Sequence, residues 1–407
     1  MNSEARYRAL ISFLLRHQSI WFQSILQNWP ASQEAYPEAW LAWIEGLDAD
    51  DQRAFGDEQR VEGMPTDLLA LLRTCAEFCE WNQLLEMHRL DDLDIQGLNL
   101  KKQHEIQRLL PLLAREAGGI KHAVDIGGGM GHLARLCVKT FGWTFHSIDK
   151  DAVLQEKGRW WLKRSRGLDR EKLRFVNATF SDQAAPDIDR LFAEPSTLSL
   201  GLHTCGPLAL SQFQKSLESR TLVNFGCCYD KMDRTRDLNQ SRTAKELNLP
   251  WSQAALFLAT RSRKGMTDEE FTLLKRVNAY RFSFDLYIRQ QWPELGFVIA
   301  GDAPKALYLG SFATYALDRI THLKLDHEPT GDVLESFYRS PSIQKEATAI
   351  FAAHLIRNLF ARPLEIAILL DRALWLEEHG FAVELLQVFD RQLSPRNIAL
   401  VARSKAR

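Results

Sequence analysis

Glycines gather around one aspartate in a short stretch of this 407-residue sequence, residues 122–135. Four glycines, Gly127, Gly128, Gly129 and Gly131, follow a short apolar run and precede a helical pattern. Such a run lets the backbone turn tightly and lie against a ligand that any Cβ would block. The N–H groups that open the following helix would face an anionic or polar ligand over the loop. This stretch is therefore the first candidate binding site.

The spacing of the glycines separates two kinds of ligand. The dinucleotide fingerprint G-x-G-x-x-G requires a third glycine where this sequence has His132. The pattern is instead D-x-G-x-G-x-G, from Asp125 to Gly131, and it resembles motif I of the class I S-adenosylmethionine (SAM) methyltransferases. Asp149 ends the next predicted strand about 20 residues after the glycines, the distance at which an acid meets ribose hydroxyls. A glycine turn without a ligand is the plainer alternative.

The residues expected around SAM share a place in the glycine loop or at the end of a predicted strand. They are Asp125, Gly127, Gly128, Gly129, Met130, Gly131, Asp149, Lys150, Asn177, Ala178 and His203.

Alternating strands and helices must position these residues. We expect buried strands at residues 122–126, 143–149, 173–176, 197–202 and 221–225, and a closing pair at 381–389 and 397–402. This order predicts an α/β, Rossmann-like class I methyltransferase sheet, mostly parallel with a closing antiparallel hairpin. Ligands bind such sheets at the carboxyl ends of the strands.

A second group able to do chemistry follows the fourth and fifth predicted strands. His203 and Cys205 end one strand, Cys227 and Cys228 end its neighbour, and neighbouring strands lie about 4.8 Å apart. We take these four residues as the catalytic candidates. Three interpretations stay open: His203 orients or deprotonates the acceptor, the group binds a metal ion, or the cysteines pack beneath the cofactor. Adjacent cysteines point to opposite faces of a strand, and we assign no metal ligand from the sequence.

The substrate-binding candidates are Lys101, Lys102, His104 and Tyr229. The two lysines open a helix expected from Leu100 to about Glu116. Cations at the N-terminal end of a helix interact unfavourably with the helix dipole. This small electrostatic cost suggests that the lysines have a function.

Outside the sheet the sequence is typical of helices. We divide the chain into a helical N-terminal domain (1–95), a SAM-binding core (96–230), a helical insertion for substrate recognition (231–360) and a return of the core (361–407). Within the first domain, residues 66–85 are predicted as one helix. In the insertion, Lys275, Arg276 and Arg281 alternate with aromatic residues, which fits either a nucleic-acid face or a solvated helix surface.

Composition bounds the remaining possibilities. Hydrophobic residues make up 45% and charged residues 25% of the chain, as in globular proteins. The formal net charge of −1 gives no global argument for nucleic-acid binding. Since the sequence has no long apolar run, no signal-peptide pattern and only six cysteines, we expect a cytoplasmic protein without a membrane partner.

Several stretches together resemble the methyltransferase-like 25 family, which includes ribosomal RNA adenine dimethylase domain-containing protein 1. The matching stretches are Lys101–Glu105, Val124–Gly131, Gly201–Gly206, Gly226–Tyr229, Leu369–Arg372 and Leu393–Asn397. The resemblance implies SAM-dependent methyl transfer on a class I fold. The sequence lacks the Asn/Asp-Pro-Pro-Tyr element of amino-adenine methyltransferases, which argues against adenine dimethylation.

We therefore predict a SAM-dependent methyltransferase whose favoured acceptor is RNA or a ribosomal protein, with an unknown oligomeric state. An NAD-linked oxidoreductase on a similar sheet is the enzymatic alternative. A non-catalytic SAM-binding scaffold is the other.

Overall fold

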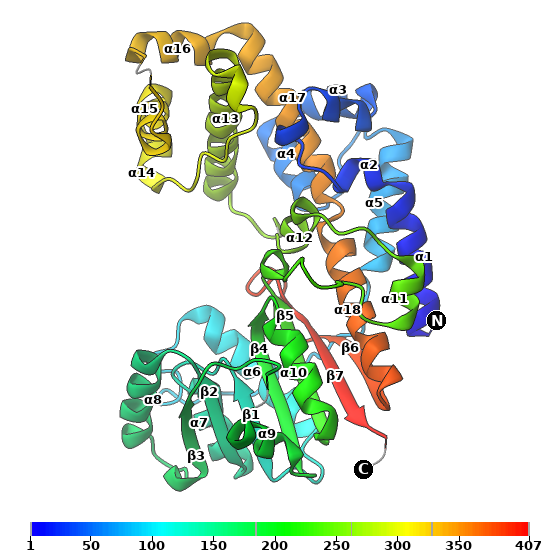
Figure 1. The fold of residues 1–407 in the computed structure, drawn as a ribbon, viewed down its shortest axis with the longest axis vertical. Helices are drawn as coiled ribbons and strands as arrows, with labels where there is room; N and C mark the ends of the chain where they lie inside the picture. Colours follow the sequence, from blue (N-terminus) through cyan, green and yellow to red (C-terminus); the bar gives the residue numbers. More distant parts are fainter. Residues whose placement is uncertain (1, 184, 262, 327–328, 406–407) are drawn as a thin grey trace. The chain divides into compact units, whose positions relative to one another are not determined.

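The computed structural model of the protein describes residues 2–183, 185–261, 263–326 and 329–405. The chain divides into two compact units, and each is described by itself. The sheet unit comprises residues 1–16, 78–262 and 362–407, and the helical unit comprises residues 17–77 and 263–361. Figure 1 shows the elements of both units in chain order.

One seven-stranded sheet organises the sheet unit, with the strand order β3-β2-β1-β4-β5-β7-β6. The first five strands pair in parallel, and β7 pairs antiparallel with both β5 and β6. The predicted Rossmann-like sheet with a closing antiparallel hairpin is confirmed. The strands are β1 (His122–Ile126), β2 (Thr144–Asp149), β3 (Leu173–Asn177), β4 (Thr197–Cys205), β5 (Thr221–Cys227), β6 (Phe381–Gln387) and β7 (Ile398–Ser404).

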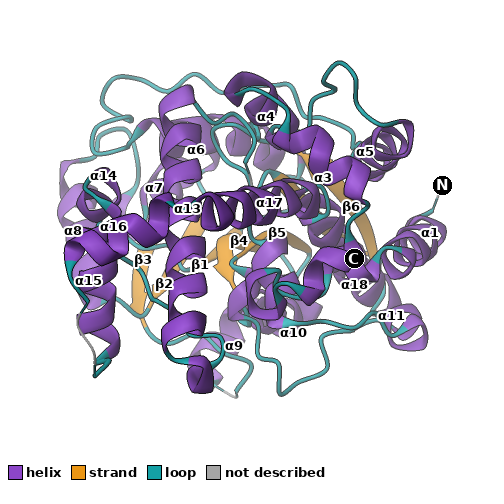
Figure 2. Ribbon diagram, turned by 90° about the horizontal axis from the view of Figure 1, so that it is seen from above, coloured by secondary structure: helices purple, strands orange, loops and turns teal. Residues whose placement is uncertain are grey.

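Helices enclose this sheet, as Figure 2 shows with the strands in orange. On one face, Ala123 of β1 belongs to an apolar cluster with residues of α6 and α7, such as Leu109 and Leu133. On the other face, Val124 packs in a cluster that includes Phe192 of α9. This alternation follows from the two-residue period of side chains along a strand. The helices of the unit are α1 (Ser3–Arg16), α6 (Leu100–Arg115), α7 (His132–Phe141), α8 (Ala152–Arg164), α9 (Pro186–Ala193), α10 (Leu208–Lys215), α11 (Arg242–Leu247), α12 (Gln253–Ala259) and α18 (Ala361–Glu378).

Caps fix where the site-bearing helices begin. The Asn99 side chain accepts a hydrogen bond from Lys102 N–H at the start of α6. The Asp151 side chain accepts bonds from the N–H groups of Val153 and Leu154 at the start of α8. Each cap satisfies helix N–H groups that would otherwise have no partner.

Helix α18 is enclosed by protein over most of its length. Residues 361–374 are all buried. Its buried acid Glu365 pairs with Arg362 at 2.5 Å and with Arg396 at 2.7 Å. Such pairing lets ionised groups occupy a helix interior to the fold.

Two segments near the N-terminus differ from their sequence prediction. The helix expected over residues 66–85 ends at Phe78, because residues 82–84 add to the edge of the sheet by hydrogen bonds with Gln387. Helix α1 belongs to the sheet unit rather than to a separate N-terminal domain. Its Arg6 guanidinium donates to the carbonyls of Phe78 and Glu80.

The helical unit has its own apolar core, in which Tyr280, Phe284 and Tyr315 are buried. Its helices are α2 (Gln18–Trp21), α3 (Glu38–Glu45), α4 (Ala49–Gly56), α5 (Thr66–Phe78), α13 (Asp268–Gln291), α14 (Lys305–Leu309), α15 (Phe312–Leu323), α16 (Gly331–Arg339) and α17 (Pro341–Asn358). The longest, α13, opens with a capping box between Thr267 and Glu270. No described helix is long and apolar enough to cross a membrane.

Candidate active site

The carboxyl ends of the parallel strands bring most of the predicted residues to one edge of the sheet. The glycine loop follows β1, Asp149 ends β2, and Asn177 ends β3. Cys205 ends β4 and Cys227 ends β5, and these two residues are register partners on neighbouring strands. Because β1 to β5 run parallel, all of these groups lie at the edge where sheets of this kind bind ligands.

The glycine loop adopts a backbone that other residues rarely take. Gly127, Gly129 and Gly131 have positive φ angles of 75°, 54° and 64°. The turn is closed by a hydrogen bond from Gly131 N–H to Gly128 O at 2.8 Å. Glycine is the residue that takes such angles without a steric cost.

Close packing explains the second glycine of the loop. A Cβ on Gly128 would lie 2.2 Å from Ser147 Oγ and 2.7 Å from Asp125 Oδ2. A Cβ on Gly129 would meet nothing closer than Leu154, at 3.8 Å. Gly128 is thus required by the protein itself, whereas the space above Gly129 is open for a ligand.

Asp149 joins the loop to the second strand. Its Oδ2 accepts a hydrogen bond from Gly129 N–H at 2.8 Å, and its Oδ1 accepts one from Asp151 N–H at 2.8 Å. A carboxylate has about four lone-pair positions, so both oxygens keep capacity for ligand hydroxyls. At the end of β3, Asn177 Nδ2 and Ala178 N–H both donate to the carbonyl of Asp149.

Asp125 lies beneath the loop with 3% of its surface exposed. Burial raises its pKa to about 7, and the nearby charge of Asp149 adds to this effect. Once Asp125 is ionised, its charge and that of Asp149 together favour a cationic ligand at the loop.

His203 and Glu105 form a hydrogen-bonded pair at the end of β4. His203 Nε2 lies 2.7 Å from Glu105 Oε1, and the same oxygen accepts a bond from Ser394 Oγ at 2.7 Å. Glu105 is buried, which by itself raises its pKa, but His203, Ser394 and Lys101 lower it overall. An ionised Glu105 holds the proton on Nε2 of His203, so that Nδ1 is the basic ring atom.

The three cysteines form a compact cluster. Cys205 Sγ lies 3.0 Å from Cys227 Sγ and 3.2 Å from Cys228 Sγ. The pKa of Cys205 is lowered to about 6, first by its hydrogen bond with Cys227, although partial burial opposes this. The structure therefore brings all four catalytic candidates to the ends of two adjacent strands.

Part of the sheet unit is similar in sequence to a known protein family. Residues 101–235 match a family model described as a methyltransferase domain. The chain contains a methyltransferase domain. This match implies SAM as the cofactor.

A solved structure also aligns with the chain. It is the crystal structure of a coclaurine N-methyltransferase bound to N-methylheliamine and SAH. The alignment covers 88% of this chain and 95% of that chain, with 10% identity and a TM-score of 0.25. A likeness at this level carries no argument about this protein.

The remaining predicted residues of the methyltransferase domain occupy different environments. Lys101, Lys102 and Lys150 are exposed, and Met130 is partly buried. His104 Nε2 accepts a hydrogen bond from Asp390 N–H.

Tyr229 is fully buried, and its hydroxyl donates to the carbonyl of Gly226 at 3.4 Å. This is the environment of a core residue rather than of a surface contact.

Two polar residues of the site were absent from the predicted set, Glu105 and Ser394. Glu105 shares a helix face with the buried Leu109 and Leu112. An acid on the apolar face of a helix is costly unless it has a partner. The position of Glu105 among these leucines is therefore the sequence feature that indicates a buried, partnered acid. Ser394 comes from the connection between β6 and β7, which nothing in the local sequence links to β4.

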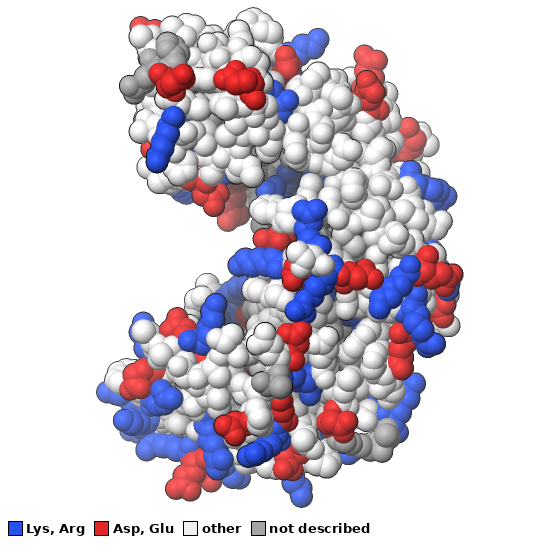
Figure 3. Space-filling model, in the orientation of Figure 1, with Lys and Arg blue, Asp and Glu red and all other residues white. Residues whose placement is uncertain are grey.

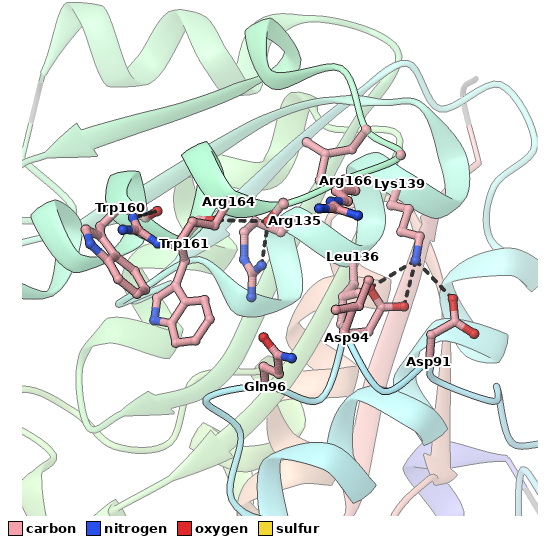
Figure 4. A pocket seen from close by; sticks show the side chains of 14 residues that line it. Asp91, Asp94, Gln96, Arg135, Leu136, Lys139, Trp160, Trp161, Arg164 and Arg166 are labelled. Carbon is pink, nitrogen blue, oxygen red and sulfur yellow. Dashed lines mark hydrogen bonds and ion pairs between the residues drawn. The ribbon is translucent and has the colours of Figure 1, made fainter.

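A pocket of about 500 Å³ lies beside the domain core, between α7, the end of α8 and residues 91–96 (Figure 4). Trp160, Trp161 and Arg164 line it, with the Arg164 guanidinium 3.5 Å from the centre of the Trp160 ring. Arg135 is 6% exposed and bonds to Ser165 Oγ and to His132 Nδ1. Burial lowers the pKa of His132 to about 4, so this ring is a neutral partner of Arg135. The pocket thus combines aromatic faces with basic side chains and with two carboxylates, Asp91 and Asp94, which pair with Lys139.

The first prediction concerns the pH dependence of SAM binding. SAM carries a net positive charge, which favours ionised Asp125 and lowers its pKa in the complex. Binding should therefore release a proton, and affinity should rise by up to about tenfold between pH 6 and pH 8. Calorimetry in buffers of different ionisation enthalpy measures both quantities. Asp125→Asn should bind SAM with little dependence on pH over this range, and wild-type affinity that is flat with pH would contradict the assignment.

The free energy of unfolding of the ligand-free protein should also depend on pH through Asp125. In contrast to SAM affinity, it should fall as pH rises. The folded pKa of Asp125, about 7, lies above the ordinary value of 3.8 that it has in the unfolded chain. A folded state that binds the proton more tightly loses stability as pH rises between these two values. Asp125→Asn should remove that loss.

Proposed function

We propose that the protein is a SAM-dependent methyltransferase that acts on RNA. The observation that carries the enzymatic part is the link between the loop and the second strand, from Gly129 N–H to Asp149 Oδ2. It sets an open space above Gly129 beside a carboxylate that retains acceptor capacity for ribose hydroxyls. The loop, Asp149 and the corner at Asn177 and Ala178 would hold the cofactor.

The Glu105–His203 pair supplies the acid–base chemistry in this proposal. Bound SAM would supply the methyl group: the acceptor atom would form a bond to the methyl carbon as the carbon–sulfur bond breaks, with its electron pair left on sulfur. His203 Nδ1 takes the proton that the acceptor loses, and Glu105 stabilises the resulting imidazolium. The hydrogen bond of 2.7 Å between the two side chains supports these roles.

An NAD-linked oxidoreductase is disfavoured by His132. That residue stands where the dinucleotide fingerprint needs its third glycine. Its ring is buried and hydrogen-bonded to Arg135, so it has a structural use in α7.

The pocket beside α8 supports RNA as the acceptor. Trp160 is 47% exposed and offers a face on which a base could stack, next to the guanidinium of Arg164. Stacking surfaces beside cations are the usual means of binding single-stranded nucleic acid. On the face drawn in Figure 3, acidic and basic residues are interspersed over the sheet unit, so a local pocket is a better candidate than a broad basic surface.

The helical unit contributes less to this argument than its sequence suggested. Lys275 Nζ donates to Gln52 Oε1, and Arg281 Nε donates to the hydroxyl of Tyr308. Both cations are engaged inside the unit, whereas the third, Arg276, is exposed.

The experiment is transfer of labelled methyl groups from SAM into fractions of a cell extract. We expect the label in material sensitive to ribonuclease and resistant to protease. Label that resists ribonuclease but not protease would indicate a protein acceptor, and no transfer at all with normal SAM binding would indicate a scaffold.

The second prediction tests the pocket. Trp160→Ala should weaken binding of single-stranded RNA by about 1–3 kcal/mol, the usual value of one base stacked on an aromatic ring. Phe257→Ala is a matched control, because Phe257 is 46% exposed and also lies under an arginine, Arg261. A filter-binding titration compares the two. Equal affinity of both variants and the wild type would remove the pocket from the RNA proposal.

A further inference from the structure

The three thiols at the ends of β4 and β5 are arranged as metal ligands would be. The sulfur atoms of Cys205, Cys227 and Cys228 all lie within 4.8 Å of one another. The three cysteines form no disulfide; Cys227 is buried, and Cys205 and Cys228 are partly buried. A zinc–sulfur bond of about 2.3 Å places tetrahedral sulfur ligands about 3.8 Å apart. Two of the observed separations, 3.0 and 3.2 Å, need to open by less than 1 Å to reach that spacing.

The backbone is shaped to bring these sulfurs together. Adjacent residues in a strand point to opposite faces, which would separate Cys227 from Cys228. Strand β5 ends at Cys227, however, and Cys228 takes a left-handed conformation with a φ of 46°. This turn places the third sulfur beside the other two.

Strain at the cluster points to a functional use. The five described non-glycine residues with positive φ include Cys228 and also His203, with a φ of 61° on the strand that carries Cys205. Such conformations cost about 1–3 kcal/mol each and gather at functional sites. At His203 the register between β4 and β5 also shifts, between Leu202 and Thr204.

We propose that Cys205, Cys227 and Cys228 bind one zinc ion through their sulfur atoms. Thiolates are soft ligands that select zinc over magnesium or calcium. Among the residues that the structure describes, the ligand group has three members. Structural zinc sites have four protein ligands, whereas catalytic sites have three and keep one position open. The fourth position of this ion is therefore held by water or by an exchangeable ligand.

The location of the zinc site suggests a function for its open coordination position. It lies at the carboxyl ends of β4 and β5, at the same edge as the glycine loop and His203. Zinc lowers the pKa of a group bound to it, so the ion would bind and activate the acceptor atom. This role rests on the proposed methyl transfer, but the metal site itself does not.

Elemental analysis and cobalt substitution test the site without any activity assay. Protein purified under reducing conditions should contain close to one zinc ion per chain, because metal affinity of a preformed thiolate site is high. Cobalt-substituted protein should show the sulfur-to-cobalt charge-transfer absorption and the intense visible bands of tetrahedral coordination. Imidazole added to the cobalt protein should shift the visible bands if one position is open.

Single substitutions assign the ligands. Cys205→Ser and Cys228→Ser should each lose most of the bound zinc, while Cys79→Ser, a reduced cysteine of the same unit outside the cluster, should retain it. Circular dichroism establishes that the variants fold.

Wild-type protein that stays metal-free after incubation with zinc and a reductant would overturn the proposal. So would alkylation and mass analysis that find Cys205 and Cys227 joined in a disulfide in the reduced preparation. Zinc binding without methyl transfer would leave the site intact and count against the proposed function instead.

Discussion

Replacing Gly129 by valine should reduce SAM affinity by a hundredfold or more, about 2.8 kcal/mol, while the protein still folds. A side chain at this position finds ordinary contact distances to the protein, 3.8 Å to Leu154 and 3.9 Å to Asp149. It would fill the space that the ligand needs. The positive φ of 54° adds a folding cost of about 1–2 kcal/mol. Equilibrium dialysis with labelled SAM, together with urea unfolding, measures both effects.

Gly142→Val is the matched control for this variant. Gly142 has a φ of 67° and its added Cβ would lie 3.8 Å from Lys172 Nζ, so it carries similar strain and similar space at the end of α7. It should lose stability and keep SAM affinity. A folded Gly129→Val protein with unchanged affinity would mean that the loop does not bind SAM.

Glu105→Gln should lower turnover by about a hundredfold or more, with SAM affinity changed by less than about threefold. The glutamine keeps the shape of the side chain but cannot stabilise a protonated His203 across their hydrogen bond of 2.7 Å. His203→Ala should have an effect at least as large. The measurement is the rate of methyl transfer into the acceptor fraction, with SAM binding followed separately.

Glu116→Gln separates this effect from general loss of a buried acid. Glu116 is also buried, but its partners are Arg403 and Arg115, away from the carboxyl ends of the parallel strands. It should lower stability and leave turnover per folded molecule nearly unchanged. Similar loss of turnover in both variants would show that Glu105 acts only through the fold.

The sequence predicts the sheet well because its strands are short apolar runs bounded by glycine and polar residues. The strand at residues 122–126 agrees with β1, and the acid at residue 149 ends β2. These features are local: periodicity, glycine turns and the order of elements along the chain. Motif spacing then suffices to place the loop and Asp149 at one edge.

Features that depend on distant contacts were not predictable in this way. Strand β4 was expected to end near residue 202, but pairing with β5 extends it to Cys205 through the irregularity at His203. The helix predicted over residues 66–85 ends at Phe78 since the following segment bonds to Gln387, about 300 residues later in the chain. Neither partner is visible in a local window of sequence.

The division of the chain differs from the predicted domains for the same reason. Residues 17–77 and 263–361 form one helical unit, and α1 joins the sheet unit. Local helical pattern describes each segment correctly but does not say which segments pack together. In the candidate site, the role of Ser394 could not be predicted from the local sequence either, because only the folded chain brings Ser394 to Glu105.

Calorimetric titration of the purified protein with SAM, and separately with NAD, tests the central claim most directly. The account predicts one SAM site per chain, no heat with NAD, and loss of the SAM signal when the protein is first saturated with SAH or carries Gly129→Val. A folded wild-type protein that gives no heat with SAM at any pH from 6 to 8, or that binds NAD in its place, would contradict it.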